Sequence, residues 1–214
     1  MASAEARSSA LRAGIRLELV TVAWMSVEAV LAIGAGVSAR SVLLTAFGAD
    51  SLIELLSGAT LLWRLRTEKA GGAGARLESV EQRAVWMSAV ILVLLCAYVV
   101  LASVFGLLFR IQPERSWLGL AVSAAAVIAM PWLASRKRDV NRTVQSPALR
   151  ADIAQAVTCA YLAGVTLLGV AVNAVTGWWW VEYIAALALL RWLVAEAHEA
   201  VEAARAGEAH SNHN

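Results

Sequence analysis

Charged residues are scarce in this sequence of 214 residues, since Asp, Glu, Lys and Arg together make up only 16% of it. Hydrophobic residues make up 60%, whereas soluble domains average about 45–50% apolar residues. An apolar excess of this size needs a second apolar phase, so the composition excludes an ordinary soluble protein and predicts an all-α protein of the membrane. Because one membrane span takes about 20 apolar residues, the chain has room for about six spans and no sizeable soluble domain.

Cysteine is also rare, and motifs for enzyme chemistry are missing. Cys96 and Cys159 fall in separate apolar stretches, so they predict no disulfide framework. The sequence contains no nucleophile–base pair, and its GGAG segment lacks the strand and helix that a phosphate-binding loop needs. We therefore expect neither an enzyme nor a bound cofactor. The net charge of +2 gives no sign of a nucleic-acid partner, and none is expected.

The apolar stretches predict six spans joined by short polar segments. The spans cover about residues 17–37, 42–62, 84–109, 117–133, 151–172 and 178–194. The polar residues 1–16 run directly into a full span, so they do not read as a cleavable signal peptide. The charged and glycine-rich segment 68–83, EKAGGAGARLESVEQR, is typical of a mobile loop.

Lys and Arg are concentrated on one side of these predicted spans. Ten of them fall in the segments between spans two and three and between spans four and five, and three more precede span one, whereas the opposite side has only Arg40, Arg110 and Arg115. Because basic loops stay in the cytoplasm, we expect a multi-pass protein of the cell (inner) membrane with both termini cytoplasmic. The predicted parts are a cytoplasmic segment 1–16, a membrane domain 17–194 and a cytoplasmic tail 195–214.

Two carboxylates in the second span are the first candidates for a functional site. Ionisable residues inside spans are costly and by default mark function. Asp50 and Glu54 are four residues apart, so they share one face of a helix. Two like charges at this spacing need a bound metal ion, a shared proton or alternation between the two. The alternative is a pair that stays protonated and hydrogen-bonds to neighbouring helices.

The fifth span offers a second pair with the same spacing, Gln155 and Cys159. At a rise of about 1.5 Å per residue, Glu54 and Cys159 both lie about 15 Å from the cytoplasmic ends of their spans. If the second and fifth spans are neighbours, these four residues form one site. Two carboxylates, a thiolate and an amide oxygen suit a borderline divalent ion such as Zn²⁺.

In the order and spacing of these motifs, the sequence resembles the cation diffusion facilitator superfamily. AFGADSLIELLSG is similar to the family's motif of span two, in which an Asp or His is followed four residues later by an Asp, a position that Glu54 occupies here. ALRADIAQAVTCAYLAG is similar to its span-five motif, with Gln155 and Cys159 where His and Asp are usual, and VEYIAALALL is similar to its sixth span. The segments RAD, CAYLAG and NAVTGWWW around and after Gln155 and Cys159 resemble a compact bacterial branch of the superfamily that lacks the usual C-terminal cytosolic domain.

The resemblance implies a homodimer that exports a divalent metal ion from the cytoplasm by proton-coupled alternating access. Asp50, Glu54, Gln155 and Cys159 are then the metal ligands. Glu28, in a span-one pattern that is also similar, belongs either to the proton route or to helix packing. Asp152 either attracts cations at the inner mouth or interacts with the dipole of its own helix.

A second hypothesis comes from the departures from the family pattern. Because the His–Asp pair of span five is replaced, the protein could instead be a membrane subunit or a metal-responsive regulator that binds metal without transporting it. Metal uptake by reconstituted vesicles distinguishes the two functions.

Overall fold

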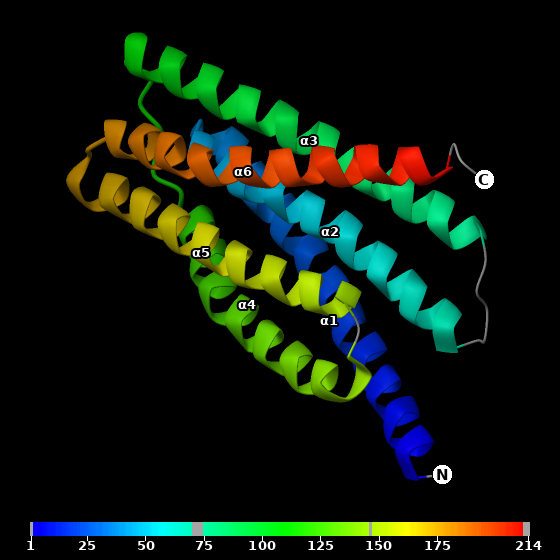
Figure 1. Cartoon of the computed structure of the whole chain (residues 1–214). Coiled ribbons are helices and arrows are strands. Elements are labelled where there is room, and N and C mark those ends of the chain that lie inside the picture. The colour runs from blue at the N-terminus through cyan, green and yellow to red at the C-terminus, as the bar shows by residue number, and fades with distance from the viewer. Residues whose placement is uncertain (1, 70–74, 146, 212–214) are drawn as a thin grey trace.

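The computed structural model describes residues 2–69, 75–145 and 147–211, and these residues form six α-helices with no strand among them (Figure 1). The predicted all-α class is confirmed. The helices are α1 (Ala2–Ala39), α2 (Val42–Lys69), α3 (Ala75–Leu108), α4 (Trp117–Val144), α5 (Pro147–Thr176) and α6 (Trp180–Ser211).

Five of these helices, α1 to α5, are long and apolar enough to cross a membrane. Large apolar side chains cover their outer surfaces: Val30 and Leu108 are each 71% exposed, and Ile128 is 74% exposed. Burying such side chains in lipid is favourable, whereas water would oppose their exposure, so the chain is a membrane-embedded protein. The apolar part of α6 contains Arg191 and is bounded by Glu182 and Glu196, which sets this helix apart from the other five.

The polar segments are more helical than the sequence predicted. Residues 2–16 are helical and belong to α1. The prediction of a loop over 68–83 is wrong for most of its length, because α2 continues to Lys69 and α3 begins at Ala75. The residues from 75 to 83 are mostly good helix formers, and the glycines that favour a loop fall in 70–74, outside the described residues.

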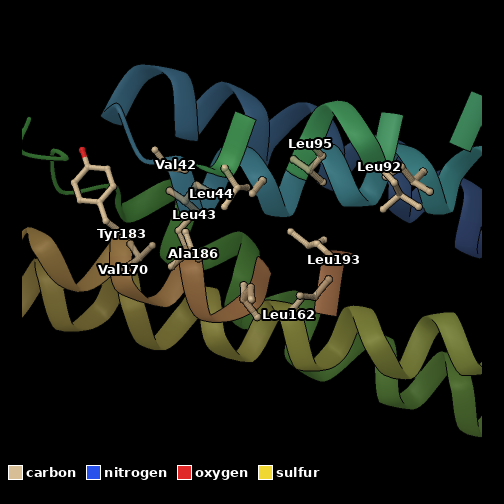
Figure 2. Close-up of a cluster of buried hydrophobic side chains, with 14 of the residues drawn as sticks. Val42, Leu43, Leu44, Leu92, Leu95, Leu162, Val170, Tyr183, Ala186 and Leu193 are labelled. Carbon is tan, nitrogen blue, oxygen red and sulfur yellow. The ribbon is translucent and has the colours of Figure 1, made fainter. Parts of the chain in front are cut away.

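The helices pack in two groups. Helices α1, α2, α4 and α5 contact one another, and α3 pairs with α6 against α2. The contact between α2 and α5 confirms the condition on which the predicted four-residue site depended. Leu43, Leu92, Leu162 and Leu193 belong to a buried cluster that joins α2, α5, α3 and α6 (Figure 2). In Figure 1 the beginning of α1 and the ends of α2 and α6 lie at the same end of the molecule.

Helices α1 and α2 approach so closely that a side chain would not fit at their crossing. A Cβ atom added to Gly48 would lie 2.7 Å from the backbone nitrogen of Ile33, and one added to Gly36 would lie 2.6 Å from that of Thr45. Small residues permit such close packing of membrane helices. Gly48 precedes Asp50 by two residues, so the crossing lies at nearly the same level of α2 as Asp50 but on the opposite side of the helix.

Replacing Gly48 by Ala is therefore expected to destabilise the protein. The backbone of Ile33 must move, and overpacking of this kind costs about 1–3 kcal/mol, which exceeds the gain in helix propensity. Gly34→Ala is the matched control, because nothing lies within 4 Å of the added Cβ. Thermal denaturation in detergent should show a lower midpoint for Gly48→Ala and an unchanged or higher midpoint for Gly34→Ala.

Candidate metal centre

Helix α2 places Asp50 and Glu54 on its buried face, and α5 places Cys159 opposite them. All three residues are buried, and each offers a ligand atom that lies within 4.8 Å of the other two. No other group of three His, Cys, Asp or Glu residues in the described part of the chain comes together in this way. The structure thus brings together three of the four residues predicted as ligands.

Glu54 has an oxygen that the surrounding protein leaves unpaired. Its Oε1 atom is buried and has no hydrogen-bond partner among the described residues. A buried polar atom without a partner costs free energy of about 1–3 kcal/mol. The arrangement around Glu54 therefore provides a site at which a bound cation or a proton would be stabilising.

Glu28 reaches the same cluster from α1, which the sequence did not predict. Its Oε1 atom lies 3.8 Å from the Cys159 sulfur and accepts a 2.7 Å hydrogen bond from the Ser51 hydroxyl. Its Oε2 atom accepts a 2.6 Å hydrogen bond from the indole nitrogen of Trp24. Glu28 is buried, and these two donors fix the orientation of its carboxylate.

Gln155 and Asp152 line a cavity beside the cluster. This cavity has a volume of about 920 Å³ and is bounded by α2, α3, α5 and α6. It reaches Ile53 and Thr158, the chain neighbours of Glu54 and Cys159. Its lining residues come from the parts of these helices nearest the end of the molecule where α1 begins and α6 ends.

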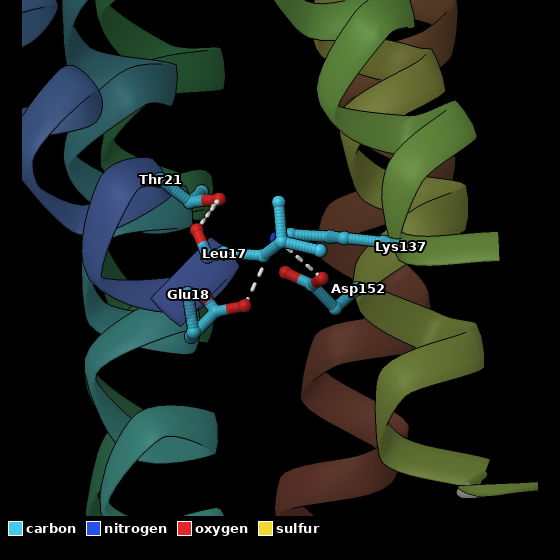
Figure 3. A network of polar contacts seen from close by, with 5 residues as sticks. All are labelled: Leu17, Glu18, Thr21, Lys137 and Asp152. Atoms are coloured by element: carbon cyan, nitrogen blue, oxygen red, sulfur yellow. Dashed lines mark hydrogen bonds and ion pairs between the residues drawn. The ribbon is translucent and has the colours of Figure 1, made fainter. Parts of the chain in front are cut away.

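Asp152 also belongs to a buried ion-pair network that connects three helices. The ammonium group of Lys137 on α4 lies 2.6 Å from Asp152 Oδ2 on α5 and 3.0 Å from Glu18 Oε2 on α1 (Figure 3). Glu18 and Lys137 are both fully buried. The charge of each is stabilised by its partner, since an unpaired charge here would be very costly.

The opposite end of the molecule is held together by another buried carboxylate, Glu182 of α6. It accepts hydrogen bonds from the Ser41 hydroxyl at the start of α2 and from the Asn173 amide of α5, the latter at 2.7 Å. The Asn173 amide also donates to the carbonyl of Pro113 at 3.2 Å. These bonds tie α6 and α5 to the connections between α1 and α2 and between α3 and α4.

Comparison of the sequence with protein-family models and with curated proteins finds no match.

Proposed function

We propose that this chain is a secondary transporter that exports a divalent, zinc-like metal ion across the cell membrane in exchange for protons. The observation that carries the proposal is the meeting of Asp50, Glu54 and Cys159 inside a membrane-embedded helical bundle. Burying three ionisable groups inside a membrane protein costs free energy, which favours a functional role over simple packing. Carboxylate and thiolate ligands suit a borderline ion.

The surroundings of the cluster support a path from one side of the membrane. The cavity lined by Asp152 and Gln155 is large enough for a hydrated ion, and it leads to the neighbours of Glu54 and Cys159. Gln155 then lies on the wall of the cavity through which an ion would reach the cluster. On the other side of the cluster, the hydrogen bonds of Glu182 join the helix ends. This arrangement fits the inward-facing state of an alternating-access cycle, with both termini cytoplasmic and α6 as the sixth span.

Protons provide the driving force in this mechanism. Metal binding requires deprotonated carboxylates and a thiolate, so binding releases protons and protonation weakens the metal. Protons that reach Asp50, Glu54 and Cys159 from the outside would favour release there. The resemblance to cation diffusion facilitators gives the outward direction and the homodimer, and lipid surrounds the exposed apolar faces.

Transport by reconstituted vesicles tests the proposal. Purified protein in vesicles with an imposed pH gradient is expected to accumulate Zn²⁺ or Cd²⁺ faster than protein-free vesicles, and collapsing the gradient with a protonophore should remove the difference. If the vesicles accumulate none of Zn²⁺, Cd²⁺, Mn²⁺ and Fe²⁺, the carrier function is wrong. Metal binding without accumulation would favour the non-transporting subunit or metal-responsive regulator.

A further inference from the structure

The fourth ligand of the metal centre is a separate question from transport. The spacing of the fifth span predicts Gln155 in this role, but no hydrogen bond joins Gln155 to the cluster, and its side chain lines the cavity. Glu28 instead lies in contact with Cys159. We infer that Glu28 of α1 is the fourth ligand, so that three helices, rather than two, hold the divalent ion. This inference rests on the proposed metal site.

The distance between Glu28 and Cys159 fits shared coordination. In a tetrahedral zinc site, a sulfur at about 2.3 Å and an oxygen at about 2.0 Å from the metal are about 3.5 Å apart. The Glu28 Oε1 atom and the Cys159 sulfur are 3.8 Å apart. Glu28 is not in the group whose ligand atoms lie within 4.8 Å of one another, so its carboxylate must move toward Asp50 and Glu54 when an ion binds.

A ligand needs a free lone pair and a fixed orientation, and Glu28 has both. Its Oε1 atom accepts from the Ser51 hydroxyl and from the Cys159 thiol, and loss of the thiol proton on metal binding frees the second lone pair for the ion. The Trp24 bond to Oε2 holds the other end of the carboxylate. Donors that orient a ligand in this way are usual around metal sites.

The unpartnered oxygen of Glu54 points independently to a ligand at this place. Its Oε1 atom is buried without a hydrogen bond among the described residues, and Glu54 belongs to the group that includes Cys159. Glu28 and Asp50 both act electrostatically on Glu54. A divalent ion held by Glu54, Asp50, Cys159 and Glu28 would offset two of the negative charges of these ligands, and it would fix α1 against α2 and α5.

Cobalt binding to the full chain in detergent tests the inference, because a thiolate–Co²⁺ bond gives a charge-transfer absorption band. Glu28→Gln removes the charge and Glu28→Asp keeps it but withdraws the carboxylate by about 1.5 Å, one carbon–carbon bond. A ligand must lie within a few tenths of an ångström of its position. Both variants should therefore bind Co²⁺ at least about tenfold more weakly, whereas Gln155→Ala should bind within about twofold of the wild type.

Two outcomes would overturn the inference. If Glu28→Asp binds like the wild type while Glu28→Gln does not, Glu28 acts through its charge alone. If Gln155→Ala loses affinity and both Glu28 variants keep it, Gln155 is the fourth ligand. Either result leaves the transport proposal intact as long as wild-type vesicles accumulate metal. Glu28-dependent binding without accumulation supports the ligand assignment and overturns transport. Size-exclusion chromatography and circular dichroism establish that each variant is folded.

Discussion

Replacing Asp50 by asparagine is expected to lower the initial rate of metal accumulation in vesicles at least about 100-fold, the effect of roughly 2.7 kcal/mol on a binding or transition-state free energy. Asparagine keeps the size of the side chain but loses the negative charge that both the metal and the proton require. Asp50 lies in the cluster where α2 and α5 bring two carboxylates to a thiol. Every version of the carrier mechanism therefore needs its charge.

A matched substitution separates this effect from a general loss of charge. Asp139 undergoes the same chemical change in Asp139→Asn, but it is exposed, and its ion pair with Arg142 lies at the surface. Surface pairs contribute little to stability, so Asp139→Asn should transport at the wild-type rate. Transport by Asp50→Asn at more than about a tenth of the wild-type rate, a change under 1.4 kcal/mol, would rule out Asp50 as an essential ligand.

The membrane bundle and most of the candidate site could be predicted from the sequence because their signals are strong and local. Long apolar runs locate the spans, and the resulting depths put Glu54 and Cys159 at the same level. These local signals do not predict which helices pack against one another. The contact between α2 and α5 then brings Asp50, Glu54 and Cys159 together.

The position of Gln155 shows where spacing stops being informative. Four residues correspond to about 400° of helix rotation and about 6 Å of rise, so Gln155 is turned by about 40° from Cys159 and lies at a different depth. On α2 both members of such a pair, Asp50 and Glu54, reach the cluster. On α5 the turn is enough to leave Gln155 on the wall of the cavity.

The burial of Lys137 could not be predicted from the sequence because its neighbours are also basic. Lys137 lies between Arg136 and Arg138 in a basic stretch that indicates how the protein is oriented in the membrane. Nothing in that stretch distinguishes the buried Lys137 from the exposed basic residues around it. The depth argument that paired Glu54 with Cys159 would also have placed Glu18, Lys137 and Asp152 at one level. Three charged residues at the cytoplasmic ends of three spans could therefore have predicted this ion-pair network.

The second large effect expected is on stability, from Lys137→Met. Methionine fills a similar volume but leaves Glu18 and Asp152 buried without the ammonium that lies 3.0 Å and 2.6 Å from them. Removing one partner from a buried ion pair costs about 3–5 kcal/mol. Because the network connects α1, α4 and α5, the loss should affect the whole bundle. Denaturation in detergent should show it as a lower free energy of unfolding.

A triple variant distinguishes the loss of charge pairing from the loss of packing. When Glu18→Gln and Asp152→Asn are added to Lys137→Met, no unpaired charge remains, so most of the lost stability should return, as it does when buried ion pairs are replaced as a unit. Arg138→Met is the matched control, since Arg138 is exposed and should change the free energy of unfolding by less than about 0.5 kcal/mol. Equal losses in the single and triple variants would mean that Lys137 stabilises the bundle through its aliphatic chain. Recovery would mean that its charge connects the wall of the cavity to α1.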